Sequence, residues 1–235
     1  MNKTKLFKAA TISRYLYMKT KLIFKILSVA VFLLIYSTAI CAEEIRTIKL
    51  LLPQMDGGKP LMRALKERKS MREFASRELT PQALSDLLWA ACGINRPDSG
   101  GRTAPTAKNM QEIDLYVVKA EGVYLYNAKT NMLMPVLAGD IREFTGKQPF
   151  VKDAPVNLIF VANISKMGGM SAQDADFYAA TDTGFVSENV YLDCASAGLA
   201  TVVRGWVDKA GLAKAMKLKP DQRIVLAQTV GYQAQ

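Results

Sequence analysis

The segment Glu67–Phe74 reads ERKSMREF and holds three cations, a hydroxyl and a terminal aromatic ring within eight residues. It continues the segment KPLMRALKERKS, residues 59–70, which has a helical spacing of i, i+3, i+4 and i+7 at Leu61, Ala64, Leu65 and Arg68. That spacing predicts one face of a helix opened by Pro60. The cluster therefore lies where a helix gives way to an extended segment.

In an extended segment, side chains two residues apart point the same way, so Ser70 and Arg72 share a side that Arg68 can reach from the helix end. An arginine on an apolar stripe is costly to bury without a partner. A phosphate would provide acceptors for arginine forks and a hydroxyl. The alternative is a solvated helix end in which Glu67 and Glu73 pair with these cations.

The N-terminal part of the chain predicts export. Residues 1–42 contain seven Lys and Arg and no acidic residue, and an uncharged run, ILSVAVFLLIYSTAI, precedes CAEE. This order is typical of a secretory signal peptide, with cleavage expected near Ala42. The alternative is an uncleaved membrane anchor, but the run is shorter than the roughly 20 apolar residues that span a bilayer. We therefore expect a periplasmic or secreted protein that contacts the membrane only if the leader is uncleaved.

Charge and composition exclude several classes of function. Removing the seven leader cations from the 31 basic residues leaves 24 against 21 acidic residues, a net charge of +3. This small excess, without a basic run interleaved with aromatics, argues against nucleic-acid binding. The chain has no histidine, which excludes Ser-His-Asp catalysis and His-ligated zinc. Cys92 and Cys194 fall within apolar helical patterns and are interpreted as small buried hydrophobes rather than a disulfide.

Residues 43–235 are predicted to form a single α+β domain. A helix is expected over LTPQALSDLLWAACGIN, with Thr80 as its N-cap and Gly93 at its end. A long loop, NRPDSGGRTAPTAKNMQ, should turn into a helix near Thr106. Three strands are expected within IDLYVVKAEGVYLYNAKTNMLMPV, and a buried strand in APVNLIFVAN. A long helix over TDTGFVSENVYLDCASAGL, a strand, a short helix and the strand RIVLAQTVGY complete the domain.

The order of these motifs resembles the nitroreductase family of flavoproteins. RKSMREF is similar to the family's R-x-S-x-R-x-F opening, and RTAPTAKNMQ is similar to its P-S-x-x-N-x-Q flavin loop. TDTGFVSENVYLDCASAGLATVVRGWVD resembles its D-x-G-x-x-x-Q-N helix and glycine turn, and VGYQ stands where V-G-Y-P is common. The resemblance runs from about Pro60 to Tyr232. It is strongest to the branch that includes the azoline and thiazole biosynthesis dehydrogenases.

This resemblance implies a central, mostly antiparallel sheet flanked by helices, with FMN bound in a homodimer. It also implies an oxidoreductase that passes electrons to or from a small organic substrate in a ping-pong cycle. The residues that it assigns to FMN are Arg68 and Ser70 at the phosphate, Lys69 beside them, Arg72 near the pyrimidine edge, Thr106, Asn109 and Gln111 at the ring or ribityl chain, and Gly205 at flavin N5.

Two positions depart from the family pattern. Glu188 replaces a glutamine, and Arg204 replaces a glutamate that many members carry beside Gly205. The second change implies more positive charge around the ring, so Arg204 is included among the expected cofactor residues. No metal site and no G-x-G-x-x-G fingerprint are found, so neither the electron donor nor the substrate can be named. The alternative function is a flavin-binding or accessory protein without turnover.

Overall fold

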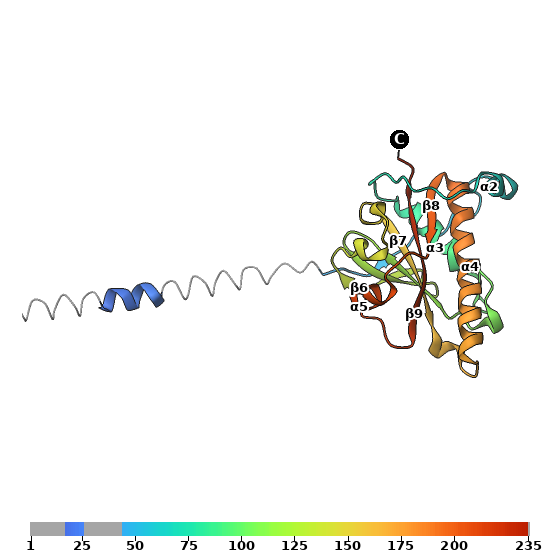
Figure 1. The fold of residues 1–235 in the computed structure, drawn as a ribbon. Coiled ribbons are helices and arrows are strands. Elements are labelled where there is room, and N and C mark those ends of the chain that lie inside the picture. The colour runs from blue at the N-terminus through green and yellow to red at the C-terminus, as the bar shows by residue number, and fades with distance from the viewer. Residues whose placement is uncertain (1–16, 26–43, 235) are drawn as a thin grey trace, which may run out of the picture. The chain divides into compact units, whose positions relative to one another are not determined.

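The structure, a computed structural model, describes residues 17–25 and 44–234 (Figure 1). Glu44–Gln235 make up one compact unit, and residues 17–25 form a helix that belongs to a separate unit, Met1–Glu43. Most of the predicted leader therefore lies outside the described residues. Within the described ranges, no helix is both long enough and apolar enough to cross a bilayer.

A seven-stranded sheet forms the centre of the larger unit, with strand order β1-β6-β5-β4-β7-β9-β8. All neighbouring strands pair antiparallel. This confirms the predicted α+β class and the mostly antiparallel sheet. The strands are β1 Ile48–Lys49, β4 Ile113–Val118, β5 Gly122–Asn127, β6 Met132–Ala138, β7 Val156–Asn163, β8 Leu199–Arg204 and β9 Gln222–Tyr232.

The two central strands are apolar on both faces, as a sheet covered on both sides requires. Leu115 pairs with Phe160, and the next residue, Tyr116, pairs with Ile159. Leu115 and Phe160 belong to one buried cluster, whereas Tyr116 and Ile159 belong to another. Because side chains alternate along a strand, these two clusters lie on opposite faces of the sheet.

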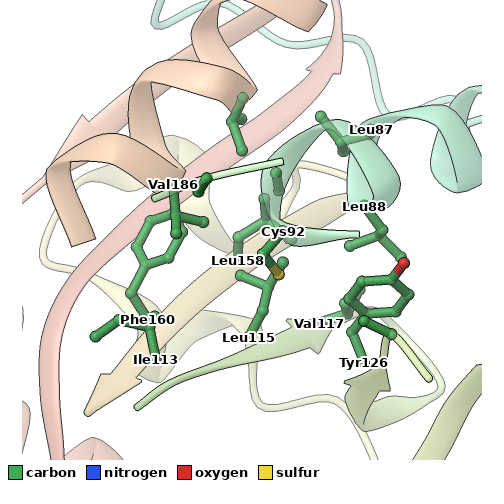
Figure 2. Packing of buried hydrophobic residues seen from close by; sticks show 14 of the residues in the cluster. Leu87, Leu88, Cys92, Ile113, Leu115, Val117, Tyr126, Leu158, Phe160 and Val186 are labelled. Atoms are coloured by element: carbon green, nitrogen blue, oxygen red, sulfur yellow. The ribbon is translucent and has the colours of Figure 1, made fainter. Parts of the chain in front are cut away.

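Helices cover both faces. The first cluster joins the sheet to α3 (Pro81–Cys92) and α4 (Ala172–Ala197), and Figure 2 shows Leu87, Leu88 and Cys92 of α3 packed over this face. The second cluster joins the other face to Leu212 of α5 (Lys209–Ala215). Leu87, Leu88 and Leu212 have no exposed surface, and each such side chain contributes about 1.5–3 kcal/mol through burial.

The helix boundaries follow capping chemistry. α2 spans Leu61–Glu67, and α3 starts at its predicted cap, where Thr80 accepts a hydrogen bond from the Ala83 N–H. α4 begins nine residues before the predicted Thr181, because Ser171 caps it through the Asp174 N–H. It ends at Gly198, whose φ of 75° is readily adopted by glycine.

The predicted long loop after α3 is in part a hairpin. β2 (Ile94–Arg96) pairs with β3 (Gly101–Arg102), and a 3-10 turn, η1, follows at Ala107–Asn109. The helix expected near Thr106 is therefore present only as this single 3-10 turn, with Thr106 at its N-cap. Lys108 within η1 has a φ of 53°, in the left-handed region, which prevents an α-helix from continuing.

Both cysteines of the compact unit are free and buried, as expected. Cys92 and Cys194 lie on α3 and α4 in the first cluster. Burial raises the pKa of the Cys92 thiol to about 11 and that of Cys194 well above its ordinary value. Both thiols therefore serve as small core side chains.

Candidate functional site

The segment after α2 runs extended beside the end of the sheet. Arg68 leaves the helical conformation, with ψ of 122°. The Met71 N–H donates to the Thr201 carbonyl of β8 at 2.9 Å, and Phe74 forms a bridge with Gln233. These backbone contacts hold the segment against β8 at Met71 and against the end of β9 at Phe74.

Tyr191 of α4 ties this segment to the same strand. Its hydroxyl accepts the Val203 N–H at 3.0 Å and lies 2.8 Å from Ser70 Oγ, while the Arg68 guanidinium lies over its ring at 5.3 Å. Either hydroxyl can donate to the other, because the Tyr191 oxygen keeps a second lone pair after it accepts from Val203. In either case Tyr191 fixes the position of the Ser70 hydroxyl. Sequence reasoning missed Tyr191, because its Ser70 partner is 121 residues away.

The cations of this cluster have no carboxylate partner. Glu67 bonds to Lys59 and Arg63, both at 2.7 Å, and these hydrogen bonds lower the pKa of Glu67. Within residues 17–25 and 44–234, no ion pair involves Arg68, Lys69 or Arg72. The alternative of Glu67 and Glu73 neutralising the cluster is therefore wrong.

The loop that carries the next predicted residues has an unusual backbone. Lys108, Asn109 and Gln111 have φ values of 53°, 55° and 50°. Such left-handed conformations are costly for residues with side chains, and they persist when the surroundings impose them. They are often concentrated at functional sites.

Gln111 and Asn109 have different positions in this loop. The Gln111 amide oxygen accepts from Arg102 Nε at 2.9 Å, and its nitrogen donates to the Gly100 carbonyl and to Asn109 Oδ1, both at 3.0 Å. Gln111 is thus held inside the loop, whereas Asn109 is exposed. The Gln111 N–H donates to Thr106 Oγ1 at 2.9 Å, which closes the loop.

Arg204 lies inside the protein. Its side chain donates to the Thr145 carbonyl at 2.6 Å and to Asn157 Oδ1 at 2.9 Å, and it is 4 % exposed. Burial lowers the pKa of Arg204 to about 10. Asn157 in turn accepts the Thr229 hydroxyl at 2.6 Å. The guanidinium therefore holds the sheet to the segment around Thr145 and does not join the cations of residues 68–72.

Gly205 follows directly at the exposed end of β8. A Cβ built there would meet only Leu226, at 3.7 Å, which is an ordinary contact. Gly205 is also absent from the residues of positive φ. Neither the space nor the backbone of this fold requires a glycine at position 205.

The predicted residues thus fall into two groups along α4. The strand-end group, Arg68, Lys69, Ser70, Arg72 and Gly205, is anchored at Tyr191. The loop group, Thr106, Asn109 and Gln111, is anchored at Asp182, which accepts the Ala107 N–H at 2.8 Å. Nine residues separate Tyr191 from Asp182, a rise of about 13.5 Å along a helix. One chain therefore does not bring the two groups into contact.

Comparisons with known proteins place the chain in a family. Residues 65–232 match the model of the nitroreductase family. A protein of Methanocaldococcus jannaschii, provisionally named a nitroreductase, is 30% identical over 183 residues, which are 74% of this chain and 91% of that protein.

Solved structures agree. A provisionally named nitroreductase from Ralstonia eutropha is 44% identical, with a TM-score of 0.78 over 81% of this chain and 91% of that one. A second, from Desulfovibrio desulfuricans and described in complex with FMN, has a TM-score of 0.55 at 19% identity, covering 75% of this chain and 88% of that one. The motifs, the antiparallel sheet and these matches lead to one conclusion: the chain belongs to the nitroreductase family.

Proposed function

We propose that this protein is an FMN-dependent oxidoreductase acting on a small organic substrate. The observation that carries the proposal is the arrangement of Arg68 and Ser70 on Tyr191. There, cations without an ion-pair partner among the described residues lie beside a hydroxyl that Tyr191 holds in place. Family membership and the FMN complex of a structural neighbour support the same cofactor.

The strand-end group fits a phosphate. Arginine forks and hydroxyls form charge-assisted hydrogen bonds with phosphate oxygens, and these bonds are stronger than neutral ones. Arg68 and Ser70 would hold the phosphate, with Lys69 beside them. Arg72, exposed on the same segment, would place positive charge near the pyrimidine edge of the flavin.

The remaining residues fit the rest of the cofactor. Gly205, which the fold itself does not require, leaves room for a ring to approach the backbone. Asn109 offers its exposed amide, and Thr106 and Gln111 hold the loop that presents it. FMN would supply two-electron chemistry, receiving electrons from a donor and passing them to an acceptor in separate half-reactions.

A homodimer would unite the two groups. Leu61, Met62 and Leu65 of α2 are 62 %, 76 % and 46 % exposed, and Phe185 of α4 is 43 % exposed. Large apolar side chains exposed together mark interaction surfaces. A Cβ built on Gly184, next to Phe185, would meet nothing within 4 Å, so a partner helix could approach α4 closely there. Sedimentation of the flavin-loaded protein at micromolar concentration tests this, and a monomer would contradict it.

The cofactor and the reaction are tested together. The purified protein should be yellow, and mass analysis of the released cofactor should give FMN and not FAD. Under anaerobic conditions, the flavin absorbance should bleach with a two-electron donor and return when an acceptor is added. Absence of flavin after reconstitution would contradict the proposal, and flavin that binds without cycling with any donor would favour the non-catalytic alternative.

We also propose that the protein acts outside the cytoplasm. The residues from Arg68 to Gly205 meet only after folding, so a chain exported unfolded would have to bind FMN after transport. A version lacking residues 1–42 and made in the cytoplasm should be nearly full of flavin, whereas the exported form should be partly empty. Absorbance ratios of the two preparations measure this. A full-length protein that stays in the cytoplasm with residues 1–42 intact would contradict export.

A further inference from the structure

Two buried carboxyl groups lie directly beneath the loop group. Glu112, just before β4, has no exposed surface, and Asp182 of α4 is 2 % exposed. The two side chains contact consecutive residues of the loop: Glu112 Oε2 lies 3.4 Å from the Thr106 hydroxyl, and Asp182 Oδ2 lies 2.8 Å from the Ala107 nitrogen. Among the described residues, Glu112 Oε1 has no hydrogen-bond donor. Two buried carboxyl groups side by side are less costly when one of them is protonated, and the unpartnered Glu112 oxygen is a place for that proton.

In the part of the chain that the structure describes, no ion pair involves Glu112 or Asp182. On the neighbouring elements, Lys166 bonds to Asp114 Oδ1 at 2.6 Å and to the Gln111 carbonyl at 3.2 Å. Arg102 bonds to the Gln111 side chain and to the Cys92 carbonyl, both at 2.9 Å. Both cations are thus used at the edges of the loop, and the Cys92 thiol remains neutral because its pKa is raised. A proton is the remaining means of removing one of the two negative charges.

The pair holds the loop at two points. Asp182 Oδ2 accepts the Ala107 N–H at 2.8 Å, and Glu112 Oε2 accepts the Thr106 hydroxyl at 3.4 Å. The same Thr106 oxygen accepts the Gln111 N–H at 2.9 Å. The carboxyl pair therefore holds the start of the loop directly and its end through Thr106.

This support matters because the loop cannot hold its own conformation. Lys108, Asn109 and Gln111 all lie in the left-handed region, which residues with side chains rarely adopt unless neighbouring contacts impose it. Loss of the contacts at Thr106 and Ala107 would let these residues return to ordinary backbone angles. Asn109 would then move from the position in which the loop presents it.

We propose that Glu112 and Asp182 share one proton and act as positioning residues for the loop 106–111, so that the FMN affinity depends on pH. The inference rests on the proposed function for its cofactor. Burial first, and the charge of Asp182 with it, raise the pKa of Glu112 to about 7. Below this pH the shared proton holds the loop. Above it, two buried carboxylates repel one another and the loop relaxes.

The first measurement uses the flavin-free full chain. NMR should show the amide resonances of Ala107 and Gln111 shifting together between pH 6 and 8.5, with the same midpoint as the Glu112 carboxyl carbon. In Glu112→Gln, the amide can still donate to Asp182 but cannot titrate, so the shifts should disappear. Glu121→Gln is the matched control, because Glu121 lies at the turn after β4, is half-buried beside Lys119 and makes no contact with the loop, so this variant should behave as the wild type.

The second measurement is FMN affinity, followed by quenching of flavin fluorescence over the same pH range. Affinity should fall several-fold with rising pH in the wild type and in Glu121→Gln. In Glu112→Gln the affinity should fall less over the same pH range. The FMN phosphate also titrates, with a second pKa of about 6. That effect is the same for all three proteins, so it cancels when they are compared. If Glu112→Gln does not fold, Asp182→Asn replaces it.

The outcomes separate the two proposals. Amide shifts that are absent in the wild type, or that persist unchanged in Glu112→Gln, would overturn the shared proton and its hold on the loop. The same holds for an affinity whose pH dependence is identical in wild type and variant. If no FMN binds at any pH, the proposed function fails, while the NMR measurement still decides whether the pair positions the loop.

Discussion

The Ser70 hydroxyl and the Tyr191 hydroxyl lie 2.8 Å apart, and Tyr191 also accepts the Val203 N–H at 3.0 Å. The Tyr191 phenol thus connects the segment after α2, the long helix α4 and the end of strand β8. It also fixes the position of the Ser70 hydroxyl through their hydrogen bond. The orientation of the strand-end group therefore depends on a residue outside the opening motif RKSMREF.

Tyr191→Phe should destabilise the protein and weaken FMN binding. The Val203 N–H is part-buried and loses its acceptor, which costs about 1 kcal/mol, the lower end of the range for an unsatisfied donor. Ser70 also loses the partner that orients it. Urea unfolding and flavin titration measure the two effects. Tyr178→Phe, also on α4 but not bonded to Ser70 or Val203, should leave affinity unchanged. Equal affinity of Tyr191→Phe and wild type would exclude the phenol as an orienting group.

Arg68→Ala should weaken FMN binding by about 1.5–3 kcal/mol, the range for a hydrogen bond to a charged group. At 1.4 kcal/mol per factor of ten, that loss is tenfold or more in Kd. Arg77→Ala is the control, because Arg77 lies over the Tyr232 ring at 3.7 Å and outside the strand-end group. If both variants bind FMN as tightly as the wild type, Arg68 is not a phosphate ligand.

The elements that were predicted correctly rest on local signals. The strands β4 and β7 follow from alternating or continuous apolar residues, and α3 follows from Thr80 and Gly93 at its ends. The early start of α4 had a local signal too, because Ser171 and Asp174 have the capping spacing. That signal was overlooked because the first turns of α4 are polar and exposed.

The features that were not predicted depend on contacts between distant segments. Left-handed angles at Lys108, Asn109 and Gln111 cannot be inferred from these residue types, since the surroundings impose them. Arg204 was expected near the flavin ring from its position beside Gly205. Its burial depends on Thr145 and other residues far away in sequence, which no motif reports.

Gly146→Ala should destabilise the fold by about 1–3 kcal/mol, the range for an overpacked core. A Cβ there would lie 1.9 Å from Arg204 Nη1 and 2.7 Å from Gln148 Oε1. The Arg204 guanidinium cannot move away from the new Cβ without breaking its hydrogen bonds to the Thr145 carbonyl and Asn157. Gly146 is extended, so the effect would come from space and not from backbone strain.

Thermal unfolding of Gly146→Ala should be compared with that of Gly168→Ala. A Cβ at Gly168 would meet nothing within 4 Å, and its φ is −53°. The control should therefore be close to the wild type. If Gly146→Ala were equally stable, the Arg204 network would be more mobile than its contacts indicate.

Asp193→Asn should stabilise the protein above neutral pH. Asp193 lies on α4 with Oδ2 unbonded among the described residues, and burial first, then the charge of Asp86, raise its pKa to about 7. The folded state therefore holds the proton more tightly than the unfolded state, whose pKa is near 3.8. The stability gained from that proton is complete below about pH 3.8 and is lost as the pH rises to about 7.

At pH 8 the Asp193→Asn variant, which carries no charge to bury, should be more stable than the wild type by about 1–3 kcal/mol. Near pH 4 the difference should vanish. Urea unfolding at both pH values measures this, with the exposed Asp98→Asn as control. A difference that is the same at pH 4 and pH 8 would mean that Asp193 is not the titrating group.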